Sequence, residues 1–135
     1  MTADNFFKSF KYKKEDIENY VEKANEDLQI ARDSDTPKVK TLFSYNALIK
    51  LGIAGIAYKK RKRVRSKRGH HIKILEGLSD ILDNKDVSVI GHTIRKKRNS
   101  DLYFADSVFT EKESQEYFNF VQKIYKKVKA LIKDT

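Results

Sequence analysis

Hydrophobic positions along the chain recur at steps of three and four residues, a spacing that places them on one face of a helix. A first helix is expected from about Lys14 to Asp33, with the apolar face Ile17, Val21, Ala24, Leu28 and Ala31. A second helix is expected from Pro37, because residues 34–36 offer capping oxygens and proline is tolerated in a first turn. It should run to about Lys60 and be the central, most buried helix. Its broad apolar face comprises Val39, Leu42, Phe43, Ile49, Ile53, Ile56 and Ala57.

Glycine occurs twice in this central helix, at Gly52 and Gly55. Without side chains, the two residues would let another helix approach closely. Alternatively, they are simply tolerated in a helix that packing stabilises.

The same spacing predicts three further helices in the second half of the chain. The third follows Gly69 and has the apolar positions Ile72, Leu75, Leu78 and Leu82. The fourth runs from about Val87 to Tyr103, with a core face of Val87, Ile90 and Ile94. The fifth should begin at Thr110 and Glu113, which form a T-x-x-E capping box, and continue towards the C-terminus.

The order of these segments predicts an all-α fold, an antiparallel bundle of four to five helices joined by short loops. Residues 13–135 are expected to form a single domain, since 135 residues suffice for one core and not for two comfortable ones. Residues 1–12 carry four aromatic side chains and no helix start signal. They are expected to be a loose N-terminal arm that packs its aromatics or remains mobile.

Composition narrows the classes of function. The absence of cysteine excludes disulfides, thiolate zinc sites and a cysteine nucleophile, and it fits a reducing cytoplasm. The longest uncharged apolar run, Leu51 to Tyr58, is far shorter than the roughly 20 residues that cross a bilayer. Aromatic residues alternate with charges in MTADNFFKSFKYKK, unlike a secretory signal. A cytoplasmic protein that does not act at a membrane is therefore expected.

Positive charge is concentrated in one run of ten residues. Its eight cations are Lys59, Lys60, Arg61, Lys62, Arg63, Arg65, Lys67 and Arg68; removing them from the net charge of +10 leaves only +2 for the other 125 residues. Mutual repulsion favours a solvated loop or a frayed helix end unless an anion neutralises the run. It could bind a nucleic-acid backbone, contact a protein or an anionic membrane, or simply be solvated. With no aromatic inside it, base stacking is not predicted.

The two adjacent histidines that follow this run, His70 and His71, are weak candidates for chemistry. Neighbouring residues on a helix point in different directions, so the pair does not make a metal site. We interpret them as capping groups or phosphate contacts at the start of the third helix. No metal ion and no cofactor are predicted for this chain.

The fourth helix carries the most concentrated set of polar candidates. On a helical wheel, His92, Asn99 and Tyr103 form a stripe that faces away from the core, with Arg95 beside it. Arg98 lies at the border between core and stripe, where its stem can cover apolar surface while its guanidinium reaches a cleft. Such a cation can bind two phosphate oxygens at once. On residue type alone, Arg98, Asn99 and Tyr103 are equally compatible with a cap, an ion pair and a packing anchor.

These residues resemble the motif of the HEPN superfamily, small helical-bundle proteins that include prokaryotic toxin and defence ribonucleases. In that motif an arginine is followed by a polar residue, with a histidine four to six residues beyond the arginine. Arg98 and Asn99 match the first two positions, and Tyr103 stands where the histidine is expected. FSYNALIKLGIAGIAY resembles the second helix of such domains and GHHIKILEGL the start of the third. The resemblance covers roughly residues 14 to 132.

The resemblance implies a metal-independent endoribonuclease of a toxin–antitoxin or defence system, working in a cleft between the subunits of a homodimer. Arg98 would stabilise phosphate charge, Asn99 would orient the substrate, and Tyr103 or His92 would transfer a proton. Arg95 and the basic run would bind RNA or another nucleic acid, and an antitoxin or other protein would be a further partner. A phenol with a pKa near 10 is a poor base at neutral pH. The alternative is therefore a non-catalytic HEPN-type nucleic-acid-binding or protein-assembly module.

Overall fold

The structure, a computed structural model, describes residues 6–101 and 109–133. Within these residues the chain forms five helices and one antiparallel two-stranded sheet. The helices are α1 (Lys14–Asp33), α2 (Pro37–Lys60), α3 (His70–Leu82), α4 (Asp86–Asp101) and α5 (Glu111–Lys133); the strands are β1 (Phe7–Ser9) and β2 (Lys62–Val64). The predicted all-α bundle is confirmed, with a small sheet added to it.

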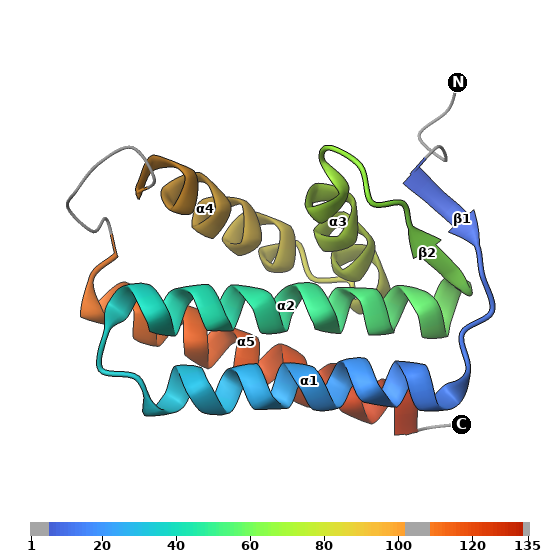
Figure 1. Cartoon of the computed structure of the whole chain (residues 1–135), viewed down its shortest axis with the longest axis horizontal. Helices are drawn as coiled ribbons and strands as arrows, with labels where there is room; N and C mark the ends of the chain where they lie inside the picture. The colour runs from blue at the N-terminus through green and yellow to red at the C-terminus, as the bar shows by residue number, and fades with distance from the viewer. Residues whose placement is uncertain (1–5, 102–108, 134–135) are drawn as a thin grey trace.

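Helix α2 is the centre of the bundle. Helices α1 and α5 lie along one side of it, and α3 and α4 lie on the other (Figure 1). Between residues 41 and 57, a stripe at Leu42, Phe43, Asn46, Lys50 and Ile53 is partly buried or exposed, and the other residues are all buried. They include Tyr45, Leu48, Leu51 and Ala54, none of which has any exposed surface. The prediction that this is the most buried helix is confirmed.

The helix ends follow the local signals in the sequence. Pro37 occupies the first turn of α2. At the start of α5, the backbone N–H of Glu113 donates to Thr110 Oγ1 at 3.1 Å, and the backbone N–H of Thr110 donates to Glu113 Oε1 at 3.2 Å. The predicted capping box is therefore confirmed. Among the described residues, no helix combines the length and the apolar character that crossing a membrane requires.

Glycine lets α3 and α4 pack very closely against their neighbours. A Cβ at Gly52 would lie 2.4 Å from Ile74 Cγ2, and one at Gly91 would lie 2.6 Å from Leu75 Cδ1. Both distances are too short for two carbon atoms in contact. A larger residue at Gly52 would also meet the backbone oxygen of Ile74, 3.3 Å away, and so displace α3, whereas one at Gly91 would require the end of the Leu75 side chain to move. At Gly55 the corresponding distance, to Leu78 Cδ1, is 3.2 Å. The close-approach interpretation of the glycines in α2 is thus correct for Gly52.

The two-stranded sheet was not predicted, and it corrects the expectations for the arm and the basic run. Strand β1, from the arm, pairs with β2, from the basic run, with Phe7 opposite Val64 and Ser9 opposite Lys62. Arg61, in the left-handed conformation with φ of 52°, ends α2 and turns the chain into β2. The run is therefore neither a solvated loop nor a frayed helix end over Lys62–Val64, because the arm satisfies its backbone hydrogen bonds.

The approach of α3 to α2 predicts opposite outcomes for the two glycines of α2. Gly52→Ala should destabilise the fold by up to about 2 kcal/mol, because overpacking costs roughly 1–3 kcal/mol and alanine's higher helix propensity returns about 1 kcal/mol. Gly55→Ala is the matched control. It meets only the flexible end of Leu78 and should keep or raise stability. Urea denaturation of both variants measures the difference, and equal stabilities would contradict the close packing.

Candidate functional site

Three helices bring four polar side chains together: Tyr45 from α2, His71 from α3, and Arg95 and Arg98 from α4. We call them the Arg–His–Tyr cluster. A hydrogen bond of 3.1 Å joins the hydroxyl of Tyr45 to Nδ1 of His71. The guanidinium carbon of Arg98 lies 5.2 Å from the centroid of the Tyr45 ring, a cation–π contact. Tyr45 is completely buried and His71 half-buried, so the cluster has one face in the core and one open to solvent.

The environment of this cluster keeps its imidazole neutral. Burial lowers the pKa of His71, and electrostatic interaction with His70, Arg98 and Arg95 lowers it further. Burial also raises the pKa of Tyr45, against the opposing effect of the two guanidiniums. At pH 7 the cluster therefore combines two fixed cations, a phenol that keeps its proton and an imidazole that can accept one.

Arg95 holds a donor without an acceptor. Its Nε is buried, and among the residues that the structure describes it has no hydrogen-bond partner. A buried donor left unpaired costs about 1–3 kcal/mol. Arg95 and Arg98 lie beside the same imidazole and make this site rich in positive charge and in N–H donors. This is the chemistry that binds an oxyanion.

Helix α4 is held in place at two positions near these arginines. Before them, Gly91 packs against Leu75 of α3. Between them, Lys97 forms a hydrogen-bonded ion pair with Glu113, the capping residue of α5. This hydrogen bond lowers the pKa of Glu113 and raises that of Lys97, so both stay charged over a wide pH range. The guanidiniums are therefore presented from a backbone anchored to two other helices.

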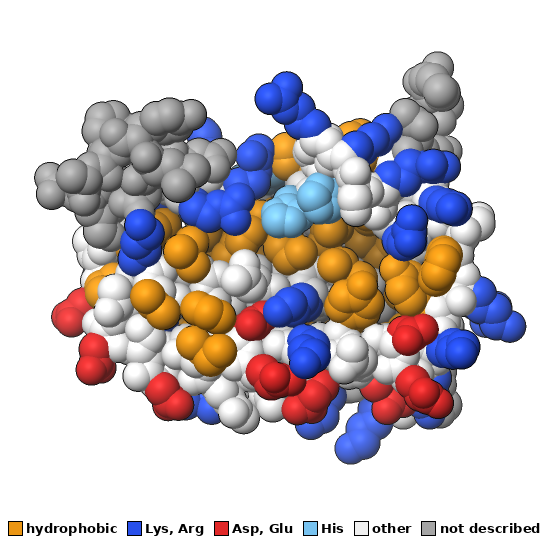
Figure 2. All heavy atoms as spheres, viewed as in Figure 1, with side chains coloured by type: hydrophobic (Ala, Val, Ile, Leu, Met, Phe, Trp, Pro, Cys, Tyr) orange, Lys and Arg blue, Asp and Glu red, His pale blue; other side chains and the backbone are white. Residues whose placement is uncertain are grey.

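The basic run forms a second positive feature beside the cluster. On the face shown in Figure 2, histidine side chains lie over the start of α3, with lysines and arginines on both sides of them, over α4 and over the β1–β2 ribbon. Acidic side chains on this face lie mainly over α1. On this face the charge is therefore segregated, with the histidine side chains in the middle of its basic part.

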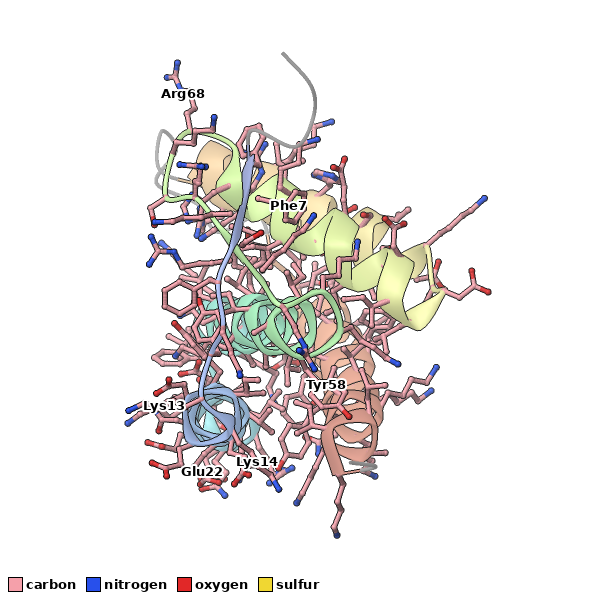
Figure 3. The ribbon with its side chains drawn as sticks, turned by 90° about the vertical axis from the view of Figure 1, so that its right-hand side faces the viewer. Phe7, Lys13, Lys14, Glu22, Tyr58 and Arg68 are labelled. Atoms are coloured by element: carbon pink, nitrogen blue, oxygen red, sulfur yellow. The ribbon has the colours of Figure 1, made fainter. Side chains whose placement is uncertain are left out.

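Aromatic rings from the arm lie against the cations of the ribbon. Lys62 Nζ lies 5.9 Å from the centroid of the Phe7 ring, Arg63 Cζ lies 5.3 Å from that of Phe10, and Lys67 Nζ lies 4.5 Å from that of Phe6. At the end of the bundle shown in Figure 3, Arg68 projects away from the protein. The run itself lacks aromatics, as the sequence shows, and the fold brings aromatic rings from the arm beside it.

The structure unites some of the predicted site residues and separates others. Arg95 and Arg98 share one site, and it includes His71, which was interpreted only as a cap or a phosphate contact. Within residues 6–101 and 109–133, no hydrogen bond, ion pair or ring contact joins His92 to this site. The side chain of Asn99 and all of Tyr103 lie outside what the structure describes. In the described ranges no group of three or more His, Cys, Asp or Glu could hold a metal ion.

The sequence contained one signal for the residues that were missed. A tyrosine in the middle of the most buried helix must find a hydrogen-bond partner for its hydroxyl. Tyr45 was predicted to lie in that helix, so a polar partner from another element was required. Nothing in the spacing of residues identified that partner as His71.

The described residues thus form a bundle of five helices with a two-stranded basic ribbon and a cationic cluster that contains a histidine of lowered pKa. In comparisons with known proteins, no family model, curated protein or solved structure matches the chain.

The lowered pKa of His71 predicts a pH-dependent stability. The unfolded chain takes up a proton at this imidazole as the pH falls below about 6.5, whereas the folded protein resists protonation to lower pH. The free energy of unfolding should therefore decrease as the pH falls from 6.5 through the folded pKa. His71→Asn keeps a hydrogen-bonding group near Nδ1 and should remove this part of the dependence. Urea denaturation at pH 7.5 and 5.5 tests it; the same change in both proteins would contradict the assignment.

Proposed function

We propose that this protein binds single-stranded RNA and cleaves it without a metal ion, using the Arg–His–Tyr cluster. The observation that carries the proposal is the position of His71, an imidazole of lowered pKa beside two arginines on a partly exposed basic face. A group that exchanges protons at neutral pH and fixed cations that bind phosphate are what metal-independent cleavage needs. The resemblance to the HEPN superfamily supports the same class of reaction.

Phosphate binding is the better supported half of this proposal. The cluster provides two guanidiniums, and the basic run beside it, residues 59–68, carries eight cations and most of the net charge of the chain. Phosphate contacts from lysine and arginine supply most of the sequence-independent affinity for nucleic acid. The cation–π contacts hold several of these side chains in place before any strand arrives, which reduces the cost in conformational entropy of binding.

The chemical step would use the free nitrogen of His71. With Nδ1 protonated and donating to Tyr45 Oη, Nε2 carries the lone pair and accepts the proton of a ribose 2′-hydroxyl. The 2′-oxygen then bonds to phosphorus as the bond from phosphorus to the 5′-oxygen breaks, and that oxygen takes a proton from water or from the imidazolium. Arg98 and Arg95 stabilise the charge that develops on the phosphate oxygens. The products are a 2′,3′-cyclic phosphate and a 5′-hydroxyl.

A non-catalytic nucleic-acid-binding module is the second candidate. It is favoured by Tyr103, which stands where the HEPN motif has its histidine. In this version Arg95, Arg98 and the ribbon hold the strand, and His71 serves only as the hydrogen-bond partner of Tyr45.

Incubation with RNA in the presence of a chelator separates the two candidates. We expect the purified protein to cleave single-stranded RNA to cyclic-phosphate products and to leave DNA of the same sequence intact, because DNA lacks the 2′-hydroxyl. Arg98→Ala and His71→Asn should each slow cleavage at least about a hundredfold, the usual contribution of a charge-stabilising group or a general base. Gel electrophoresis measures the rates, and mass spectrometry identifies the product ends.

Two results would redirect the proposal. Intact RNA that is nevertheless retarded on a native gel would establish the binding module. Cleavage by Tyr103→His but not by the natural protein would assign proton transfer to the motif position and remove that role from His71.

The basic run, residues 59–68, predicts a measurable salt dependence of RNA binding. Arg65 and Arg68 are exposed, and replacing both with alanine should reduce the slope of log affinity against log salt by about 0.7 for each phosphate that the protein no longer neutralises. Lys126→Ala with Lys127→Ala is the matched control, because it removes the same charge from the exposed surface of α5. Fluorescence anisotropy over a range of salt concentrations gives both slopes. Equal slopes for the two double variants would exclude Arg65 and Arg68 of the basic run from the RNA-binding surface.

A further inference from the structure

A cavity of about 330 Å³ lies under the β1–β2 ribbon, beside the Arg–His–Tyr cluster. Its apolar lining includes Ile53 of α2 and Val64 of β2, and two aromatic side chains, Tyr12 and Tyr20, complete that part of the wall. The two rings meet edge to face, with centroids 6.2 Å apart and an interplanar angle of 83°. A wall of this kind suits a flat, largely apolar ring system.

The remaining lining of the cavity is polar and has hydrogen-bonding capacity to spare. Arg63 and His70 line it together with Ser66, whose hydroxyl can both donate and accept. His70 Nδ1 lies 3.0 Å from the backbone oxygen of Lys67 and must donate to it, because a carbonyl oxygen only accepts. The Hδ1 tautomer of the ring leaves Nε2 as an acceptor. Donors and acceptors around an apolar slot are what the edge of a nucleobase requires.

His70 joins this cavity to the cluster. It lines the cavity, and its ring lies against that of His71, with centroids 4.5 Å apart. A strand whose phosphate is held by Arg95 and Arg98 would therefore have its neighbouring nucleotide at the mouth of the cavity. The cavity between α1 and α5 is lined by Glu18 and Glu22 as well as by Lys14, Lys129 and Lys133, and none of its lining residues belongs to the Arg–His–Tyr cluster or to the basic run.

We propose that the cavity lined by Tyr12, Tyr20, Arg63 and His70 binds one nucleobase of the RNA strand whose phosphate lies at the Arg–His–Tyr cluster. This inference rests on the proposed function and adds a subsite to it. The phosphate contacts hold any sequence, whereas the cavity senses the presence and shape of a base. It selects a single-stranded partner, because a paired and stacked base cannot enter.

Abasic substitution tests the subsite without changing the charge of the ligand. The ligands are hexamers of 2′-fluoro RNA, which lack the attacking hydroxyl and stay intact, with an abasic residue placed at each position in turn. Stacking of one base on aromatic side chains corresponds to about fivefold to a hundredfold in affinity. We expect one position at which the abasic residue weakens binding at least about fivefold, measured by fluorescence anisotropy, and little effect at the others.

A variant at the mouth of the cavity and a crosslink locate that position on the protein. Ser66 is exposed, so Ser66→Trp should fill the cavity from its rim and abolish the difference between base-bearing and abasic ligands, while Ser66→Ala should retain it. Independently of any variant, 5-iodouracil at the sensitive position should crosslink on irradiation to a peptide containing Tyr12 or Tyr20.

The outcomes distinguish failure of the base subsite from failure of the proposed function on which it rests. Equal affinities for all hexamers, or crosslinks only to other parts of the chain, would overturn the base subsite and leave phosphate binding standing. Failure of every hexamer to bind would overturn the proposed function, and the subsite with it.

Discussion

The structure depends on how closely α3 and α4 can approach the elements beneath them. Ile74 of α3 sits where a side chain at Gly52 would be, and Leu75 sits where one at Gly91 would be. Two neighbouring side chains of α3 therefore link the three helices, because each packs directly on a glycine of α2 or α4. Tyr45, His71 and Arg98 lie on those three helices, so the hydrogen bond and the cation–π contact of the cluster follow from how tightly the helices interlock.

Local patterns predicted the helices well because they depend on local physics. The steps of three and four residues, Pro37 in a first turn and the Thr110–Glu113 capping box each involve residues within one or two turns of one another. The ribbon could not be predicted in this way. Its strands have three residues each, too few for an alternating pattern to emerge, and its register depends on pairing the arm with a run far along the chain.

The site was predictable only as far as it belongs to one helix. Arg95 and Arg98 were identified because a helical wheel places residues of the same helix relative to one another. Their partners come from α2 and α3, and no periodicity reports which residue of one helix meets which of another. The choice of His92 as a proton-transfer group had this weakness. It shares a helix with Arg98, whereas the imidazole that the fold brings to the guanidiniums belongs to a different element.

The β1–β2 ribbon has an outer edge, and its charge has a consequence there. A two-stranded sheet leaves backbone N–H and C=O groups free to pair with a strand of another molecule, and edge lysines are a common protection against such pairing. Lys8 in β1 and the cations of β2 provide that protection. Positive charge along this edge opposes pairing with a second copy of the same strand by like-charge repulsion, whether or not a ligand is bound. The concentration of lysines and arginines in one short run thus has a physical consequence for an exposed strand edge as well as for an anion.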